Sequence, residues 1–190
     1  ALASPTFGEL NQTQAGAVSL YRLHELSGEL LDTDVVPVVT LLGSEDYARF
    51  GGQLLMADFN GDLKDELLVA APNRRGAAGA EAGEVFMWQG GALPVGNTRQ
   101  AEETALVSVE GATAAERLGS TLLSLDLTGD GVAELVIGSR QDGTLAPVSG
   151  KVSVYQNPLS LTRSADARML KRSPAAATGT RGNVHSTRRP

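Results

Sequence analysis

Two short acidic loops contain the residues of this chain whose types and spacing best suit chemistry with a metal ion. Both loops place oxygen-bearing side chains at positions 1, 3, 5 and 9. These side chains are Asp58, Asn60, Asp62 and Glu66 in the first loop and Asp126, Thr128, Asp130 and Glu134 in the second. Hard oxygens at alternating positions of a tight loop suit Ca²⁺, which takes roughly six to eight oxygen ligands at about 2.3–2.6 Å. The loops start 68 residues apart in matching surroundings, so the sequence predicts two calcium sites.

The loops have two other interpretations. An EF-hand needs a Glu at position 12 between two helices, but Val69 and Ile137 stand there and the flanking segments have the pattern of strands. A polar hairpin, in which Asp and Asn side chains only cap the turn, needs no ion. The EF-hand is excluded, and the polar hairpin stays open as the alternative.

Each loop also departs from an ideal calcium loop at one position. Leu63 stands at position 6, where the second loop has Gly131. If the turn requires a positive φ there, leucine costs about 1–2 kcal/mol. Thr128 at position 3 is a weaker ligand than Asn or Asp, so the second loop would rely on a water molecule at that position.

The loops belong to a repeat with a period of about 67 residues. The glycine of a Gly-x-Val element recurs as Gly16, Gly83 and Gly150. The tripeptide Arg49-Phe50-Gly51 recurs as Arg117-Leu118-Gly119, each time a few residues before an acidic loop. A fixed period of this kind is typical of proteins built from stacked structural units.

Within each period the sequence predicts about four short strands and no long helix. One strand precedes the acidic loop, one follows it, one follows the repeated glycine and a fourth completes the unit. The predicted strands are residues 53–57, 67–70, 85–88 and 105–109 in one period, 121–125, 135–137 and 152–155 in the next, and 35–42 near the start. Pro37 suggests that the strand over 35–42 lies at a sheet edge. Four antiparallel strands per repeat is the plan of a β-propeller blade, so we expect an all-β fold.

The blade count divides the chain into a propeller segment and a tail. Residues 1–162 are predicted to form about two and a half blades: a blade end over 1–42, a full blade over 43–111 and a partial blade over 112–160. Propellers usually have about four to eight blades. We therefore expect this chain to be part of a larger propeller or a truncated product.

Charge divides the chain at the same place. Residues 1–162 carry 9 Lys or Arg against 21 Asp or Glu, whereas residues 163–190 carry 7 Lys or Arg against a single Asp. The acidic segment suits a cation binder and not a nucleic-acid binder. The basic tail is rich in Ala, Ser, Thr, Arg and Pro and is predicted to be disordered. The sequence has no cysteine and no apolar run long enough to span a membrane.

These elements resemble the FG-GAP repeat, the blade unit of integrin α-subunit propellers. The residues that carry the resemblance are Phe50-Gly51, the first acidic loop, Ala71-Pro72 and Gly83-x-Val. The second copy is less faithful, with Leu118 and Thr128 at two of the family's positions. Similar repeats occur in glycosylphosphatidylinositol-specific phospholipase D and related secreted proteins. The resemblance implies that each loop holds a structural Ca²⁺, with the position 7 carbonyls of Lys64 and Val132 as further ligands.

Function follows from the resemblance more than from any catalytic motif. The sequence lacks a nucleophile elbow, a zinc-protease motif, a P-loop and a dinucleotide fingerprint, so no catalytic site is expected within it. His24 and His185 have no companions for metal binding, and Asn11 begins a glycosylation sequon. Two functions stay open. One is an extracellular adhesion scaffold that binds a protein or a membrane surface; the other is the accessory propeller of a secreted phospholipase D-like hydrolase with its zinc catalytic domain elsewhere. A cytoplasmic repeat protein with vestigial loops is a third alternative.

Overall fold

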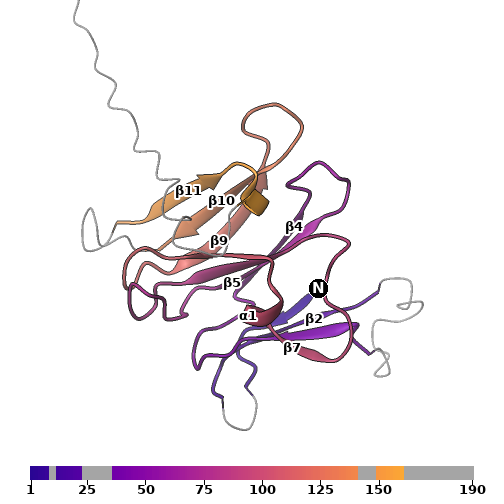
Figure 1. Cartoon of the computed structure of the whole chain (residues 1–190). Coiled ribbons are helices and arrows are strands. Elements are labelled where there is room, and N and C mark those ends of the chain that lie inside the picture. Colours follow the sequence, from indigo (N-terminus) through magenta and orange to yellow (C-terminus); the bar gives the residue numbers. More distant parts are fainter. Residues whose placement is uncertain (9–11, 23–35, 141–148, 161–190) are drawn as a thin grey trace, which may run out of the picture.

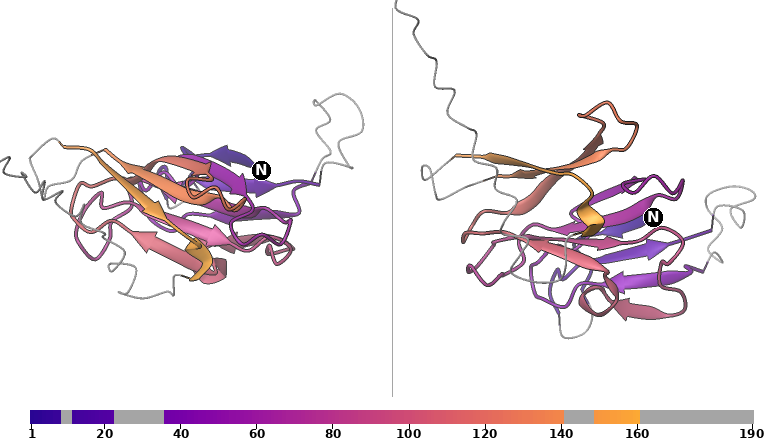
Figure 2. Two further views of the ribbon diagram at one scale, coloured as in Figure 1. Left: turned by 90° about the horizontal axis from the view of Figure 1, so that it is seen from above. Right: turned by 45° about the horizontal axis from the view of Figure 1, so that its top comes forward.

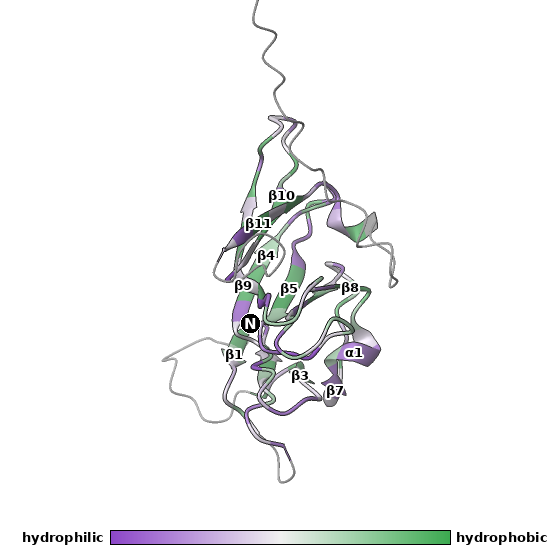
Figure 3. Cartoon of the chain, turned by 90° about the vertical axis from the view of Figure 1, so that its left-hand side faces the viewer, coloured by the Kyte–Doolittle hydropathy of each residue, from purple (hydrophilic) through white to green (hydrophobic). Residues whose placement is uncertain are grey.

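Three β-sheets stacked next to one another make up the fold (Figures 1 and 2). The structure is a computed structural model, and it describes residues 1–8, 12–22, 36–140 and 149–160. Asn11, His24, His185 and the basic tail over 163–190 lie outside the described residues. Hydrophobic residues lie mostly along the strands, whereas the short helix α1 (Ala101–Thr104) is hydrophilic (Figure 3).

The second sheet is a complete four-stranded antiparallel unit. It contains β4 (Gln53–Ala57), β5 (Glu66–Ala71), β6 (Glu84–Trp88) and β8 (Val107–Glu110), in that order. These strands match the four predicted around the first acidic loop to within two residues at each end. The predicted blade plan is therefore confirmed for this sheet.

The third sheet repeats the first three strands of that plan. It contains β9 (Leu118–Leu125), β10 (Glu134–Ser139) and β11 (Lys151–Tyr155), all antiparallel, with β10 in the middle. The register between β9 and β10 shifts at Gly138/Ser139. A short 3₁₀ helix over Pro158–Ser160 follows β11.

The first sheet differs from the prediction in its fourth strand. Its strands are β1 (Leu2–Ser4), β2 (Ala17–Leu20), β3 (Val39–Leu42) and β7 (Thr98–Gln100), in that order. β7 comes from the connection between β6 and β8 of the second sheet and pairs with β3 in parallel. The expectation that Pro37 marks an edge strand was therefore wrong. Pro37 lies before the first paired residue of β3, so its missing N–H removes no hydrogen bond from the ladder.

Together the sheets form part of a β-propeller, as the sequence predicts for the fold class. The chain is nearly all β, and each sheet packs face to face on the next one along the sequence. No helix among the described residues is long and apolar enough to cross a membrane.

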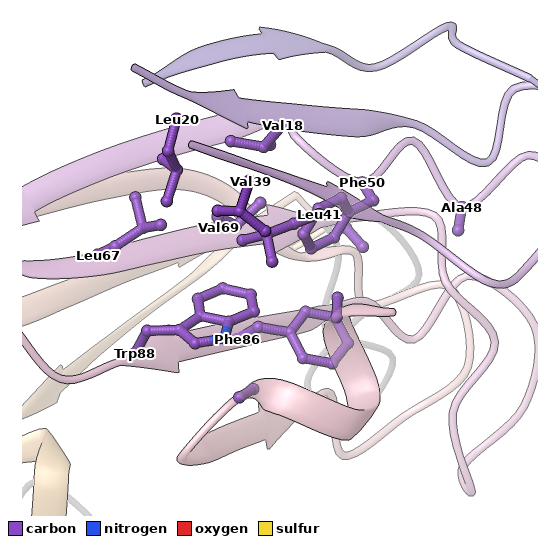
Figure 4. Packing of buried hydrophobic residues seen from close by; sticks show 13 residues of the cluster. Val18, Leu20, Val39, Leu41, Ala48, Phe50, Leu67, Val69, Phe86 and Trp88 are labelled. Carbon is purple, nitrogen blue, oxygen red and sulfur yellow. The ribbon is translucent and has the colours of Figure 1, made fainter. Parts of the chain in front are cut away.

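The second sheet is buried on both faces because alternate residues of its strands point to different neighbours. On β5, Leu67 and Val69 pack toward the first sheet, while Leu68 packs toward the third. On β6, Phe86 and Trp88 point to the first sheet (Figure 4). The ring of Phe50 meets those of Phe86 and Trp88 edge-on, with centroids 5.7 and 6.4 Å away.

Two of the repeated glycines, Gly16 and Gly83, lie where one sheet meets the next. Gly16 has φ 93°, and a Cβ atom there would lie 2.0 Å from the carbonyl oxygen of Phe50. Gly83 has φ 84°, and its Cβ would lie 2.4 Å from the carbonyl oxygen of Leu118. A backbone hydrogen bond closes the contact in both places. Phe50 N–H donates to the carbonyl of Ala15 at 2.9 Å, and Leu118 N–H donates to the carbonyl of Ala82 at 3.0 Å. Only glycine fits this junction.

Replacing a junction glycine should cost more stability than replacing a loop glycine. Gly83→Ala adds a Cβ to a crowded position with positive φ, whereas Gly129→Ala adds one at φ 77° with no heavy atom within 4 Å. We expect Gly129→Ala to lower the free energy of unfolding by about 1–2 kcal/mol. Gly83→Ala should lower it by a further ~1–3 kcal/mol because the backbone of Leu118 must move. Urea unfolding in the presence of chelator measures both; equal losses would contradict the crowded junction.

Candidate metal centre

The two acidic loops are the hairpin connections β4–β5 and β9–β10. Ala57 pairs with Glu66 and Leu125 pairs with Glu134, so position 9 of each loop opens the second strand of its hairpin. The loops extend from the same side of the molecule (Figure 1). They also lie against each other, since a Cβ atom on Gly61 would be 3.6 Å from Val132 Cγ2.

The carboxylate at position 1 organises the first loop. Asp58 Oδ1 accepts hydrogen bonds from the backbone N–H groups of Gly61 (2.7 Å), Asn60 and Asp62 (both 3.2 Å). Its Oδ2 accepts one from Leu63 N–H at 2.8 Å. Partial desolvation raises the pKa of Asp58, but these amide hydrogen bonds outweigh it, and the pKa lies below its ordinary value.

Asp126 has the same role in the second loop. Its Oδ1 accepts from Gly129 N–H at 2.6 Å and its Oδ2 from Gly131 N–H at 2.9 Å. Hydrogen bonds from the amides of Gly131 and Gly129 are the main cause that holds the pKa of Asp126 below its ordinary value. Both loops therefore wrap their backbone amides around an ionised carboxylate.

The glutamates at position 9 are buried and connect each loop to its surroundings. Glu66 Oε2 accepts from Phe59 N–H at 2.9 Å, and Glu66 Oε1 accepts from Gly90 N–H at 3.2 Å. Glu134 Oε2 accepts from Leu127 N–H at 2.7 Å. Because a buried carboxylate needs hydrogen-bond donors, these bonds fix the depth of each loop over its sheet.

The side chains at positions 3 and 9 meet in both loops. Asn60 Nδ2 donates to Glu66 Oε1 at 3.3 Å and to Asp62 Oδ2 at 3.2 Å, so its amide group lies between two carboxylates. Thr128 Oγ1 donates to Glu134 Oε1 at 3.4 Å. The structure thus brings position 3 against position 9, as a shared site requires.

Positions 5 and 7 are linked through the backbone in the same way in both loops. Asp62 Oδ1 accepts from Lys64 N–H, and Asp130 Oδ1 accepts from Val132 N–H, each at 2.9 Å. All ten residues predicted from the sequence therefore lie within two matched networks. Across the described ranges, however, no three acidic or imidazole side chains converge closely enough to hold a metal ion together.

The donor set is chemically suited to Ca²⁺, because each loop offers three carboxylates and one neutral oxygen donor. In the geometry described, those oxygens are turned toward backbone amides rather than toward one common point. A carboxylate has about four lone-pair sites, so an oxygen that accepts one amide hydrogen bond retains capacity for a cation. The residues fit the ion, provided that the side chains rotate inward.

The backbone at position 6 is left-handed in both loops. Leu63 has φ 65° and Gly131 has φ 87°. The Leu63 side chain is 93% exposed, so it contributes no packing that offsets the strain. The departure noted from the sequence is therefore a real local strain in the first loop.

Sequence reasoning missed two features near the loops. The first is Phe59 at position 2, which is fully buried between the second and third sheets. An apolar residue stands at position 2 of both loops, and this repetition could have indicated that the position is buried. The second feature is the set of contacts that Arg74 makes. This residue forms ion pairs with Glu84 and Glu102, both at 2.6 Å, and its guanidinium lies 5.6 Å from the Phe86 ring centroid. These partners lie far from Arg74 in sequence, so no local pattern indicated them.

Comparison with known proteins agrees with this geometry. Residues 50–86 and 118–155 match the family described as FG-GAP repeat, and each match spans one phenylalanine or leucine junction, one acidic loop and one repeated glycine. The chain contains FG-GAP repeats. The β4–β6 hairpins and the β9–β11 hairpins are the two FG-GAP units.

The FG-GAP region is similar to phosphatidylinositol-glycan-specific phospholipase D from several organisms. It is 26% identical to the Homo sapiens protein over 170 residues, which cover 81% of this chain and 20% of that protein. It is 30% identical to the Mus musculus protein over 156 residues (75% and 18%) and 26% identical to the Dictyostelium discoideum protein over 164 residues (81% and 17%). The chain thus spans about a fifth of the length of the curated relatives it matches.

Relief of the strain at position 6 should stabilise the protein. We expect Leu63→Gly to raise the free energy of unfolding by up to about 1 kcal/mol. The substitution relieves ~1–2 kcal/mol of backbone strain, which exceeds the backbone entropy that glycine loses on folding. The reciprocal change Gly131→Ala should lower it by about 1 kcal/mol. Denaturant unfolding with chelator present measures both. A loss of stability in Leu63→Gly would show that the side chain makes an important contact.

Acid should weaken both loops through their position 1 carboxylates. The folded-state pKa values of Asp58 and Asp126 lie below the ordinary value of 3.8, so their contribution to stability is present above that pH and is lost as pH falls through the folded values. Asp126→Asn should therefore be less stable than the unaltered chain near about pH 6, and the difference should shrink near about pH 3. Urea midpoints across this range provide the measurement; a difference independent of pH would contradict the assignment.

Proposed function

We propose that this chain is a calcium-stabilised, non-catalytic part of a β-propeller that serves as an accessory region of a phosphatidylinositol-glycan-specific phospholipase D-like protein. The observation that carries the proposal is the pair of FG-GAP repeats with matched acidic loops, in a chain whose reported relatives share one name. Those relatives favour the accessory propeller over an integrin-like adhesion scaffold. Any hydrolytic activity would belong to a part of the protein beyond this chain.

The proposed ligands are the same at each loop position. Side chains at positions 1, 3, 5 and 9 and the carbonyl at position 7 would hold the ion. These residues are Asp58, Asn60, Asp62, Lys64 and Glu66 in the first loop and Asp126, Thr128, Asp130, Val132 and Glu134 in the second. A bound Ca²⁺ supplies positive charge that offsets the repulsion among three carboxylates. The chain's own contribution is a loop already curved around its first carboxylate by backbone amides.

Ion binding would require a specific change at position 3 of the first loop. Asn60 Nδ2 now donates to Asp62 and Glu66, so a hydrogen-bond donor stands between the two carboxylates. Rotation of the amide group would present Asn60 Oδ1 in its place. In the second loop the Thr128 hydroxyl needs only to turn its proton away from Glu134.

We also propose an extracellular setting and a protein or membrane-surface partner. Extracellular calcium modules bind with dissociation constants of about 10⁻⁴–10⁻³ M, which suits small loops with three carboxylates each. Sites of this affinity are filled only where free calcium is in the millimolar range. The role of the ion would be to rigidify the hairpin tips on the side of the propeller where both loops lie.

Calcium should raise the thermal stability of the full chain. A ligand that binds only the folded state stabilises it by RT ln(1 + [L]/Kd), which is about 1.4–2.7 kcal/mol per site at ~10 mM Ca²⁺ for the affinities above. We expect a rise of at least about 3 °C in Tm relative to chelator. The combined change Asp58→Ala and Asp126→Ala should remove the rise.

The control for this experiment is an acidic residue outside the loops. Glu103→Ala on α1 changes the net charge without touching either loop and should keep the calcium response. A Tm that is the same in calcium and chelator would contradict the calcium proposal. A calcium response that survives the double substitution would place the ion elsewhere.

A further inference from the structure

The outer edge of β8 has no strand against it among the described residues. β8 pairs with β6 on one side and is the last strand of the second sheet. Its counterpart in the first sheet is β3: Gly43 after β3 donates its N–H to the Gly16 carbonyl at 3.0 Å, and Gly111 after β8 donates to the Gly83 carbonyl at 2.9 Å. The outer edge of β3 is covered by β7. An uncovered edge presents backbone N–H and C=O groups that can pair with another strand.

The strand that covers β3 comes from the connection of the next sheet. β7 and α1 lie between β6 and β8 of the second sheet. From the same connection, Leu93 packs on the apolar cluster between the first and second sheets, and Ala101 of α1 is fully buried in that cluster. β7 then pairs in parallel with β3, with Thr98 opposite Thr40. The second sheet thus holds the first through backbone pairing as well as through side chains.

A segment after β11 repeats the sequence of β7 and α1. Residues 98–106 read Thr-Arg-Gln-Ala-Glu-Glu-Thr-Ala-Leu, and residues 162–170 read Thr-Arg-Ser-Ala-Asp-Ala-Arg-Met-Leu. The Thr, Arg, Ala and Leu are identical at the same places, and an acidic residue follows the first alanine in both segments. β11 is the counterpart of β6, since each follows a repeated glycine. Residues 162–170 lie outside the described residues, so the comparison rests on their sequence.

The described part of the connection after β11 leads toward the second sheet. Leu159, in the 3₁₀ helix after β11, packs on the cluster between the second and third sheets, as Leu93 packs on the cluster between the first and second. The cluster that Leu159 joins includes Val107 and Val109 of β8. Thr162 follows three residues after Leu159 and can lie up to about 10 Å from it. The chain therefore reaches the region of the uncovered edge at the point where the repeated sequence begins.

We propose that residues 162–164 pair in parallel with the outer edge of β8, as β7 pairs with β3, and that Ala165 takes the place of Ala101. Each sheet is then held by the connection of the next one, and the edge of β8 is closed to strands from other chains. The folded part of the chain extends to about Leu170, into the segment whose composition alone predicts disorder. This pairing requires neither calcium nor a relation to phospholipase D.

The register of the existing pair determines the register of the proposed one. Thr98 lies opposite Thr40 on β3, and Ser108 is the residue of β8 that corresponds to Thr40. Thr162 corresponds to Thr98, so it should lie opposite Ser108. Arg163 is the next residue and should point to the other side of the sheet, because successive side chains of a strand alternate.

Disulfide formation in the full chain tests this register, because the sequence has no cysteine of its own. Ser108→Cys combined with Thr162→Cys should form an intramolecular disulfide in a glutathione redox buffer. Thr40→Cys with Thr98→Cys is the reference pair on β3 and β7. Ser108→Cys with Arg163→Cys is the matched control, with nearly the same tether but the opposite side of the strand. The effective concentration of the 108/162 pair should exceed that of the control by at least about tenfold, whereas a free tether would give both pairs similar values.

The thermal stability of full-length variants provides a second measurement. Ala165→Asp should lower Tm by at least about 3 °C, as should Ala101→Asp, because each places a charge against an apolar cluster. Ala175→Asp makes the same change further along the tail and should leave Tm unchanged. Equal cross-linking of the 108/162 and 108/163 pairs overturns the proposal, and so does an unchanged Tm in Ala165→Asp. A disulfide that links two chains instead of closing within one also overturns it, because the edge of β8 would then be open to other chains.

Discussion

The close backbone contacts at Gly16 and Gly83 determine how this chain folds. At Gly16 and at Gly83 the chain turns with a positive φ, and the backbone of Phe50 or of Leu118, at the start of the next sheet, fills the space that a side chain would need. The residues around the contact repeat their conformations as well: Gln14 and Glu81 have φ 53° and 52°, and Arg49 and Arg117 have φ 57° and 52°. Sheets can therefore stack at a constant offset, which buries both faces of the second sheet.

The acidic loops depend on this stacking, and they are largely organised before any ion is considered. Asp58 and Asp126 accept hydrogen bonds from the loop amides. Glu66 accepts one from Gly90, which lies in the connection after β6, and so ties the first loop to that connection. An ion that binds such a loop needs to reorient side chains more than backbone, which reduces the ordering entropy that binding must overcome. This is why a weak extracellular-type site is compatible with the geometry even though the carboxylates do not yet converge.

Sequence reasoning predicted the features that arise from local patterns. The acidic loops, the strand positions and the strain at Leu63 follow from residues a few positions apart, because hairpins and left-handed turns are local structures. The parallel pairing of β7 with β3 could not be predicted in this way, since it joins residues about 58 positions apart through tertiary packing. The burial of Phe59 and the ion pairs of Arg74 were missed because they also depend on tertiary packing: Phe59 is buried partly by the third sheet, and Arg74 meets Glu84 on β6 and Glu102 on α1.

Native-state hydrogen exchange of the junction amides tests the central claim most directly. Phe50 and Leu118 donate their N–H groups to carbonyls of the preceding sheet at 2.9 and 3.0 Å, outside any regular strand ladder. If this junction holds the repeats together, both amides exchange as slowly as those of β5, because they open only when the stack unfolds. Exchange at the rate of the exposed loop amides would contradict the account, since it would mean that the sheets separate without global unfolding.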